Sequence, residues 1–133
     1  DCSSKDLVAA LEHHKRETAG HIVRLQKIFA LIGLPPSRLA YEGIRCLIDE
    51  MKEAGNTVKF GVVRDAAIIS IFQKIKHYEI ACYGTMRAYA IALREEDVVT
   101  LLEHTLEEEK ETDQALSRIA ESHINIEAAD KEI

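Results

Sequence analysis

The stretch 68–93, IISIFQKIKHYEIACYGTMRAYAIAL, decides the fold expected for this chain of 133 residues. Steps of three and four residues trace an apolar row along one face of a long helix, with a single carboxylate, Glu79, in its middle. The row consists of Ile68, Phe72, Ile75, Glu79, Cys82, Met86, Tyr89 and Leu93. Burying an ionised carboxylate costs several kcal/mol unless a cation, a hydrogen-bonding partner or a proton compensates it. Glu79 therefore faces a metal or a polar network inside a bundle, or the helix is rotated and Glu79 lies at the boundary of the core.

Length and composition restrict the class of protein. A chain of this length suits a single domain, 1–133, in which residues 1–4 cap the first helix and residues 123–133 form a polar tail that frays. The net charge of −6 and the scattered basic residues argue against a nucleic-acid partner. The longest apolar runs fall well short of the roughly 20 residues that a membrane-spanning helix needs, so we expect no membrane partner. Three cysteines without a CxxC pair indicate a reducing compartment, and we expect a cytoplasmic protein.

Four helices are expected along the chain. Their predicted spans are 5–33, 38–54, 59–93 and 98–122. Gly33 ends the first helix, and Pro35 and Pro36 forbid its continuation because proline lacks the N–H group that a helix needs. Ser37 can cap the second, shorter helix, which Gly55 and the asparagine after it should stop.

The fold class expected from this pattern is all-α, because no alternating strand pattern of useful length appears. Long helices flank a connection that itself carries the short helix 38–54. This order is typical of helical bundles with one crossover connection rather than of simple up-down bundles. Such a bundle can hold facing carboxylates in its core.

Polar side chains fall on the inner faces of three predicted helices. The candidate metal ligands are His14, Glu17, His21, Glu79, Glu109 and Asp113. Those on the first helix are three and four residues apart, and the two on the last helix are four apart, so each set shares a face. A carboxylate-bridged pair of metal ions needs oxygen donors from several facing helices, with further ligands one turn away. The Glu-x-x-His motif usual in such bundles does not occur in this set.

Three stretches resemble the YciF/YciE-like family of bacterial stress proteins. They are HHKRETAGHIVRLQKIF at 13–29, VRDAAIISIFQKIKHYEIACYGTMRA at 63–88 and LLEHTLEEEKETD at 101–113. The resemblance covers about residues 9–120. It implies a ferritin-like, rubrerythrin-related bundle of antiparallel long helices with the short helix in the crossover. It also implies a dimetal-type centre and a link to stress, with no defined reaction.

The motifs of that family correspond to specific positions here. Its H-x-x-E-T motif corresponds to His14, Glu17 and Thr18, its H-Y-E-I motif to residues 77–80, and its E-E-E-K-x-x-D motif to residues 107–113. These matches place the candidate ligands of all three long helices within family motifs.

The chain also departs from the family. Lys76 stands where the family usually has a glutamate before H-Y-E, and Arg45 stands where the short helix usually has Met-Glu-Gly. Family members carry a further long helix upstream with a ligand motif, and this chain begins where their second helix would begin. The resemblance then implies one ligand fewer and one wall of the bundle fewer.

Simpler interpretations of the same residues stay open. An acid in an apolar row often lies at the core boundary or pairs with a neighbouring Lys or Arg. Single histidines such as His14 and His21 are more often hydrogen-bonded than metal-bound. The acidic run 107–111 is most simply a solvated helix face, with Glu109 expected to point inward and Glu108 the next candidate.

Two functions therefore follow from the sequence. The first is a ferritin-like stress-response protein with a dinuclear iron or manganese centre and an undefined reaction, which leaves open whether the chain is an enzyme. The alternative is a metal-free helical dimer that acts as a structural or interaction protein in stress response. We expect a homodimer because an apolar groove would otherwise stay exposed. The residues expected along that groove are Ile68, Phe72, Ile75, Leu25, Ile28 and Ile32.

Overall fold

The computed structural model describes residues 2–39 and 41–131, and these residues form helices and connecting segments without a β-strand. In chain order the helices are α1 (Lys5–Ile32), α2 (Glu42–Thr57), α3 (Val62–Ala92), α4 (Glu96–Ile119), the π-helix η1 (Ala120–Ile124) and α5 (Asn125–Lys131). The prediction of an all-α fold is confirmed. In this described part, no helix is long and apolar enough to span a bilayer.

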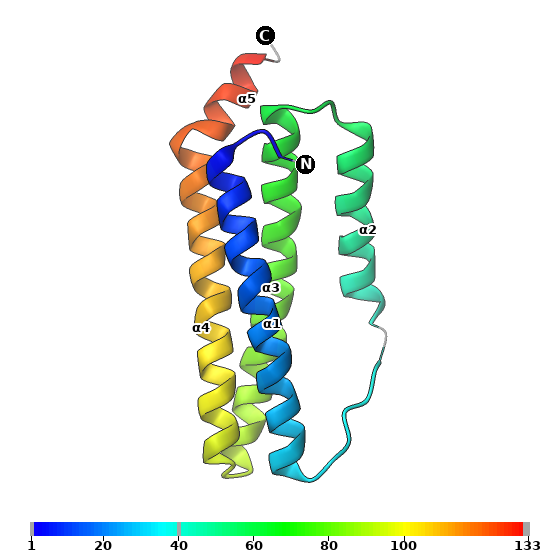
Figure 1. The fold of residues 1–133 in the computed structure, drawn as a ribbon, viewed down its shortest axis with the longest axis vertical. Helices are drawn as coiled ribbons and strands as arrows, with labels where there is room; N and C mark the ends of the chain where they lie inside the picture. The colour runs from blue at the N-terminus through cyan, green and yellow to red at the C-terminus, as the bar shows by residue number, and fades with distance from the viewer. Residues whose placement is uncertain (1, 40, 132–133) are drawn as a thin grey trace.

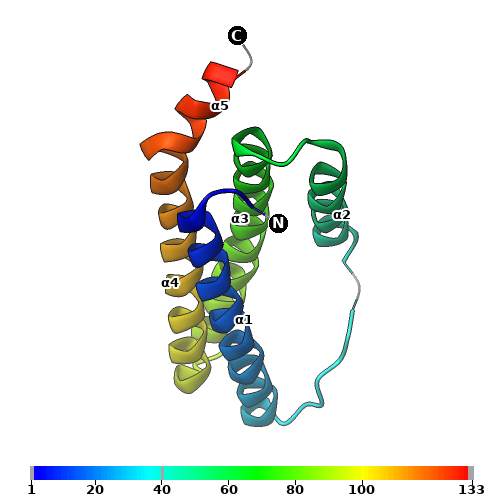
Figure 2. The ribbon, with the colours of Figure 1, turned by 45° about the horizontal axis from the view of Figure 1, so that its top comes forward.

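The three long helices form a bundle with one crossover. In Figure 1, α1 and α3 run in the same direction and α4 runs opposite to both. After α1 the chain runs back along the length of the bundle, and α2 lies within this connection before α3 begins. The helix α4 packs against both α1 and α3, whereas α2 packs against α3. Figure 2 shows the same order from a second direction, with α2 and α4 on different sides of α3.

The start of α1 is fixed by two sets of hydrogen bonds. Ser4 is the N-cap residue, and its side chain accepts a hydrogen bond from the backbone N–H of Leu7. The carboxylate of Asp65 on α3 is fully buried and accepts bonds from the backbone N–H groups of Ser3 and Ser4 at 2.7–3.1 Å. The Ser3 hydroxyl donates a further bond of 2.7 Å to the same carboxylate. Asp65 therefore clamps the beginning of α1 to α3.

Gly33 ends α1 as predicted. Its φ of 71° is in the left-handed region that glycine adopts without a steric penalty. The backbone N–H of Gly33 donates to the carbonyl of Ala30, and that of Leu34 donates to Phe29, which is the Schellman arrangement.

The other helix boundaries differ from the prediction by a few residues. The N-cap residue of α2 is Tyr41 rather than Ser37, and the helix continues through Gly55 to Thr57. The helix α3 begins later than predicted, because Gly61 adopts a φ of 142° and interrupts the helical backbone before Val62.

The apolar core consists of two clusters with a polar layer between them. The first contains Leu7, Val62, Ile69, Leu116, Ala120 and Ile124. The second contains Tyr83, Ala90, Val98 and Leu102. The buried polar side chains between them include His14, His21, Lys76, Thr105, Glu109 and Thr112. This polar layer joins α1, α3 and α4 and defines the candidate site.

The apolar row predicted in α3 is correct in its first half only. Ile68 and Ile75 are buried, whereas Tyr89 and Leu93 are 66% and 73% exposed. The buried residues in α3 instead include a row at seven-residue intervals, namely Ile69, Lys76, Tyr83 and Ala90. Because α3 is apolar on several faces, its periodicity alone does not fix the side that turns toward α4.

The chain beyond residue 122 is helical, so the prediction of a fraying tail is wrong for residues 123–131. Leu116, Ala120 and Ile124 are all buried at spacings of four residues. In an α-helix of about 100° per residue, each such step moves the side chain about 40° around the axis. The wider π-helical turn η1 offsets this drift and keeps Ile124 in the core.

Candidate functional site

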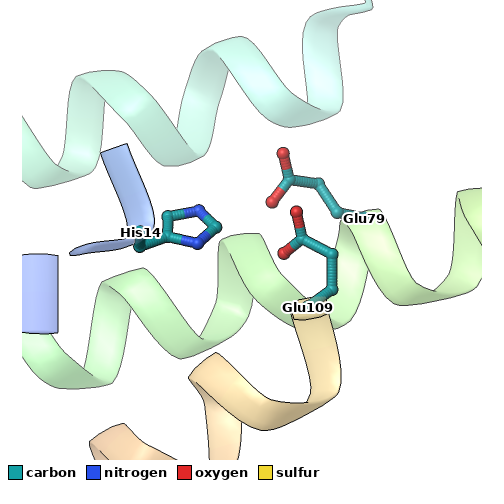
Figure 3. Close-up of side chains that lie close together, drawn as sticks. All are labelled: His14, Glu79 and Glu109. Carbon is teal, nitrogen blue, oxygen red and sulfur yellow. The ribbon is translucent and has the colours of Figure 1, made fainter. Parts of the chain in front are cut away.

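The candidate site lies where α1, α3 and α4 face one another in the polar layer. Figure 3 shows the His14 ring from α1 beside the carboxylates of Glu79 from α3 and Glu109 from α4. One donor atom from each of these three residues lies within 4.8 Å of the other two. Within the described part of the chain, this is the one group of three or more acidic, histidine or cysteine side chains close enough to share a metal ion.

Lys76 occupies the centre of this group. Its ammonium nitrogen lies 2.6 Å from Oε2 of Glu109 and 2.7 Å from Nε2 of His14, and it also forms an ion pair with Oε2 of Glu79. The Lys76 side chain is 1% exposed, and its ammonium lies 5.3 Å from the centre of the Phe72 ring. A buried cation therefore holds the three candidate ligands together.

The contacts of His14 define its protonation. An ammonium can only donate hydrogen bonds, so Nε2 of His14 must be the acceptor and the ring proton must be on Nδ1. Nδ1 lies 3.4 Å from Oε2 of Glu17 and 3.3 Å from the Thr112 hydroxyl. Burial, and after it the positive charge of Lys76, lower the pKa of His14 from its usual value of 6.5. His14 is thus a neutral imidazole that accepts from Lys76.

His21, two turns along α1, has the opposite electrostatic environment. Its Nε2 lies 2.8 Å from a Glu108 oxygen and its Nδ1 lies 3.1 Å from a Glu109 oxygen. Burial alone would lower the pKa of His21, but the hydrogen bonds to Glu109 and Glu108 outweigh it, and the pKa is raised. Each ring nitrogen of His21 thus faces a carboxylate oxygen, an arrangement that favours the protonated ring.

Glu108 connects this network to the protein surface. Both of its oxygens accept bonds from the Arg24 guanidinium, at 2.6 and 2.9 Å, in a forked geometry. These bonds lower the pKa of Glu108 to about 2. Burial acts in the opposite direction, and the hydrogen bond with His21 lowers the pKa further. The chain of contacts runs from Lys76 through Glu109, His21 and Glu108 to Arg24.

The carboxylates of Glu79 and Glu109 differ in how far nearby cations offset the cost of burying their negative charge. Burial raises the pKa of Glu79, and the attraction of Lys76 opposes that effect only in part. Burial also acts to raise the pKa of Glu109, but the hydrogen bonds from His21 and Lys76 prevail and lower it. Glu109 is therefore the firmly ionised partner of Lys76.

The structure brings together some of the predicted ligands and separates others. His14, Glu79 and Glu109 converge, and His21 contacts Glu109. Glu17 lies behind His14, where His13 and Thr112 also contact it. The Asp113 carboxylate instead faces Gln73 and His77, at 3.3 and 3.5 Å.

Lys76 and Arg24 are the functional residues that the candidate ligand set lacked. Both are long cations that reach the polar layer with buried or half-buried side chains. Two sequence signals were available for Lys76: its position three residues before Glu79, and the departure from the family pattern at that position. No comparable signal marks Arg24, whose partner Glu108 lies 84 positions away.

Two carboxylates and one imidazole are a donor set that suits a divalent transition metal. The arrangement nevertheless does not fit such an ion, because the Lys76 ammonium lies within bonding distance of all three donors. A dication placed among them would be close to a fixed positive charge. The dinuclear iron or manganese centre therefore stays a prediction that this geometry does not favour.

Two apolar hollows lie along α1 and α3. The first has a volume of about 460 Å³ and is lined by α1, α2 and α3. Its lining includes Leu11, Ile48, Met51, Ile68, Phe72 and Ile75, with Lys76 and Glu79 among the polar members. The second has a volume of about 230 Å³ and is lined by α1, α3 and the start of α4. Its lining includes Leu25, Ile28, Ile32, Met86, Tyr89 and Leu93. The residues predicted to line one groove thus line two separate hollows.

Comparison with known proteins identifies the family. Residues 1–129 match the family model described as a domain of unknown function, DUF892. Protein YciF of Escherichia coli strain K12 is 37% identical over 130 residues, which cover 97% of this chain and 78% of YciF.

Two solved structures are similar in fold and sequence. The crystal structure of the E. coli stress protein YciF has a TM-score of 0.88, covering 93% of this chain and 79% of that one at 37% identity. YcfI of Rhodopseudomonas palustris, described as a candidate structural protein, has a TM-score of 0.84 and 37% identity, covering 87% of this chain and 74% of YcfI. This chain therefore belongs to the YciF-like stress-protein family and carries its DUF892 domain.

Proposed function

We propose that this chain is a structural protein of the bacterial stress response that works as a homodimer through the apolar surface along α1 and α3. The observation that carries the proposal is the pair of apolar hollows between these helices. The E. coli relative is a stress protein, and the R. palustris relative is described as a candidate structural protein, which supports this role for the present chain.

The second hollow is the stronger part of this surface. Of the eleven residues that line it, Glu95 alone is charged. Around it, Leu31, Tyr89 and Leu93 are large apolar side chains with at least half of their surface exposed. Contiguous apolar surface of this kind is rare on soluble monomers and marks interaction sites.

A second copy of the chain is the occupant that we propose. In a two-fold pair the same patch serves both subunits, so that one surface has to be complementary only to itself. Both hollows lie between the same two helices, so one extended contact can cover both. We expect the interface to exceed about 1,000 Å², the size above which specific association is usual.

Sedimentation velocity at micromolar concentration tests the proposal. The unmodified chain should sediment as a dimer, and Tyr89→Lys and Leu93→Lys should shift it to monomer because each puts a charge into the second hollow. Because Tyr89 and Leu93 are exposed in the single chain, both variants should keep the helicity of the unmodified chain, as measured by circular dichroism. Ile126→Lys on α5, where the side chain is 60% exposed outside both hollows, is the matched control and should remain dimeric. A compact monomeric unmodified chain with native helicity would refute the proposal.

A further inference from the structure

We infer that the Lys76 ammonium is the built-in cation of this centre, taking the place that a divalent metal ion would otherwise occupy among His14, Glu79 and Glu109. This inference concerns the interior of one chain and is independent of the homodimer proposed above. It makes the YciF-like bundle of this chain independent of metal.

The number of bonds supports the assignment. An ammonium group has three N–H donors and no acceptor. Lys76 forms hydrogen bonds with Oε2 of Glu109 on α4 and Nε2 of His14 on α1, and it forms an ion pair with Oε2 of Glu79, one turn further along its own helix α3. Two of its three N–H groups therefore bond to other helices, and its charge also lies beside the Glu79 carboxylate, so the ammonium contacts all three residues that could hold a metal ion.

The charges support it as well. Glu109 has a second cationic neighbour in His21, whose Nδ1 lies 3.1 Å from the other Glu109 oxygen. Lys76 and His21 together supply the positive charge that the carboxylates of Glu79 and Glu109 require. A divalent ion added to this set would bring excess positive charge into a site where the Lys76 and Glu109 side chains are each 1% exposed.

The position of Lys76 cannot easily be vacated. Its side chain is enclosed, and its ammonium also lies over the Phe72 ring. Metal entry would require this side chain to leave three short contacts and move its charge elsewhere. Removal of the lysine by substitution, in contrast, leaves three donor atoms within 4.8 Å of one another.

The experiment compares metal binding by the full chain and by Lys76→Glu. Purified protein is freed of metal with chelator and then dialysed against Mn²⁺ or Zn²⁺, and bound metal is measured by mass spectrometry. The unmodified chain should bind only traces of metal. Lys76→Glu removes the ammonium and adds a carboxylate, so it should bind at least one ion per chain, with an unfolding temperature that rises on metal addition. A further Glu109→Gln change in that variant should weaken binding by about tenfold or more.

Lys74→Glu provides the matched control. Lys74 is on the same helix, but its side chain is half-exposed and pairs with Glu50 of α2. This variant should bind no more metal than the unmodified chain. Folded Lys76→Glu protein that binds no metal would overturn the inference.

A measurement on the unmodified chain keeps the inference testable even if Lys76→Glu does not fold. The unfolding temperature of the unmodified chain should not change when Mn²⁺, Zn²⁺ or chelator is added, because no site for the ion is free. Stoichiometric binding with a higher unfolding temperature in metal would overturn the inference directly. Lys76→Gln, which is neutral and of similar length, supplies a second variant, and it should gain metal affinity relative to the unmodified chain.

Discussion

The ammonium of Lys76 lies 2.6 Å from the carboxylate of Glu109, and each side chain is only 1% exposed. This ion pair joins α3 to α4 in the middle of the bundle, between the two apolar clusters. A buried pair is costly to desolvate, so its net contribution to stability is modest while it is intact. The loss of one partner alone is severe, because the other charge then stays buried without compensation.

Lys76→Met should therefore destabilise the protein by about 3–5 kcal/mol at neutral pH. Methionine fills much of the space of the lysine stem but leaves the Glu109 charge without its cation from α3. Equilibrium unfolding in urea measures the effect. The difference from the unmodified chain should shrink as the pH falls, because protonation removes the stranded charges.

Two variants separate the buried pair from a general effect of losing a lysine. Lys76→Met combined with Glu109→Gln should recover much of the lost stability, because the buried Glu109 charge is then removed together with its cation. Lys74→Met breaks a half-exposed pair with Glu50 and should cost only about 0–1 kcal/mol. Equal losses for Lys74→Met and Lys76→Met would contradict the assigned role of Lys76.

His14 and His21 should titrate in opposite directions, although they lie on the same face of α1. The pKa of His21 is raised above 6.5, so its stabilising effect is complete below pH 6.5 and is lost as the pH rises through the raised value. The pKa of His14 is lowered, so its neutral form stabilises the fold above pH 6.5, and this contribution decreases as the pH falls. Titration of the imidazole protons by NMR measures both values. A His21 pKa below that of His14 would contradict the assigned contacts of these two histidines with Lys76, Glu108 and Glu109.

Glu108 should account for part of the acid sensitivity of the protein. Its pKa is lowered from 4.5 to about 2 by Arg24, so its contribution to stability is present above about pH 4.5 and is lost as the pH falls toward 2. Glu108→Gln should flatten the dependence of the urea midpoint on pH over this interval. Glu107→Gln changes the exposed neighbour and is the control, whose pH profile should match that of the unmodified chain.

Asp65→Ala should release the first residues of α1 from α3. The fully buried carboxylate accepts bonds from both Ser3 and Ser4, and one hydrogen bond to a charged group is worth about 1.5–3 kcal/mol. We expect a loss of at least this size in urea unfolding, together with faster hydrogen exchange of the amides at residues 3–8. Asp6→Ala, which removes an exposed acid from the first turn of α1, should cost only about 0.3–1 kcal/mol.

Much of the fold could be predicted because the relevant signals are local. Ser4 and Gly33 each act within a few positions of the chain, and they mark the two ends of α1 in the structure. The start of α2 could not be placed, because Ser37 is a good cap residue but the helix begins behind Tyr41. The rotation of α3 could not be predicted either, since apolar residues lie on several of its faces.

The candidate site was predictable in its acids and histidines but not in its cations. Glu109, His14 and His21 lie on apolar rows, and that pattern indicates their burial. A lysine in sequence is normally assigned to the surface, because its stem can reach water from most helix positions. The inward direction of Lys76 depends on His14 of α1 and Glu109 of α4, and only the assembled structure brings these two side chains to it.

The π-helical turn η1 has a consequence for how this region tolerates insertions and deletions. A π turn holds one more residue than an α turn, so it can be viewed as a single-residue insertion absorbed within a continuous helix. Deletion of Glu121, which is exposed, should convert the π turn to α-helix and shorten the helix by one residue. The core residues before the turn should keep their packing. Ile124 would then follow Leu116 by seven residues, which in an α-helix is about 20° short of two full turns, so it would stay on the face that packs in the core. Relatives that lack one residue here should accordingly have a continuous α-helix, with a large apolar side chain seven residues after the position of Leu116.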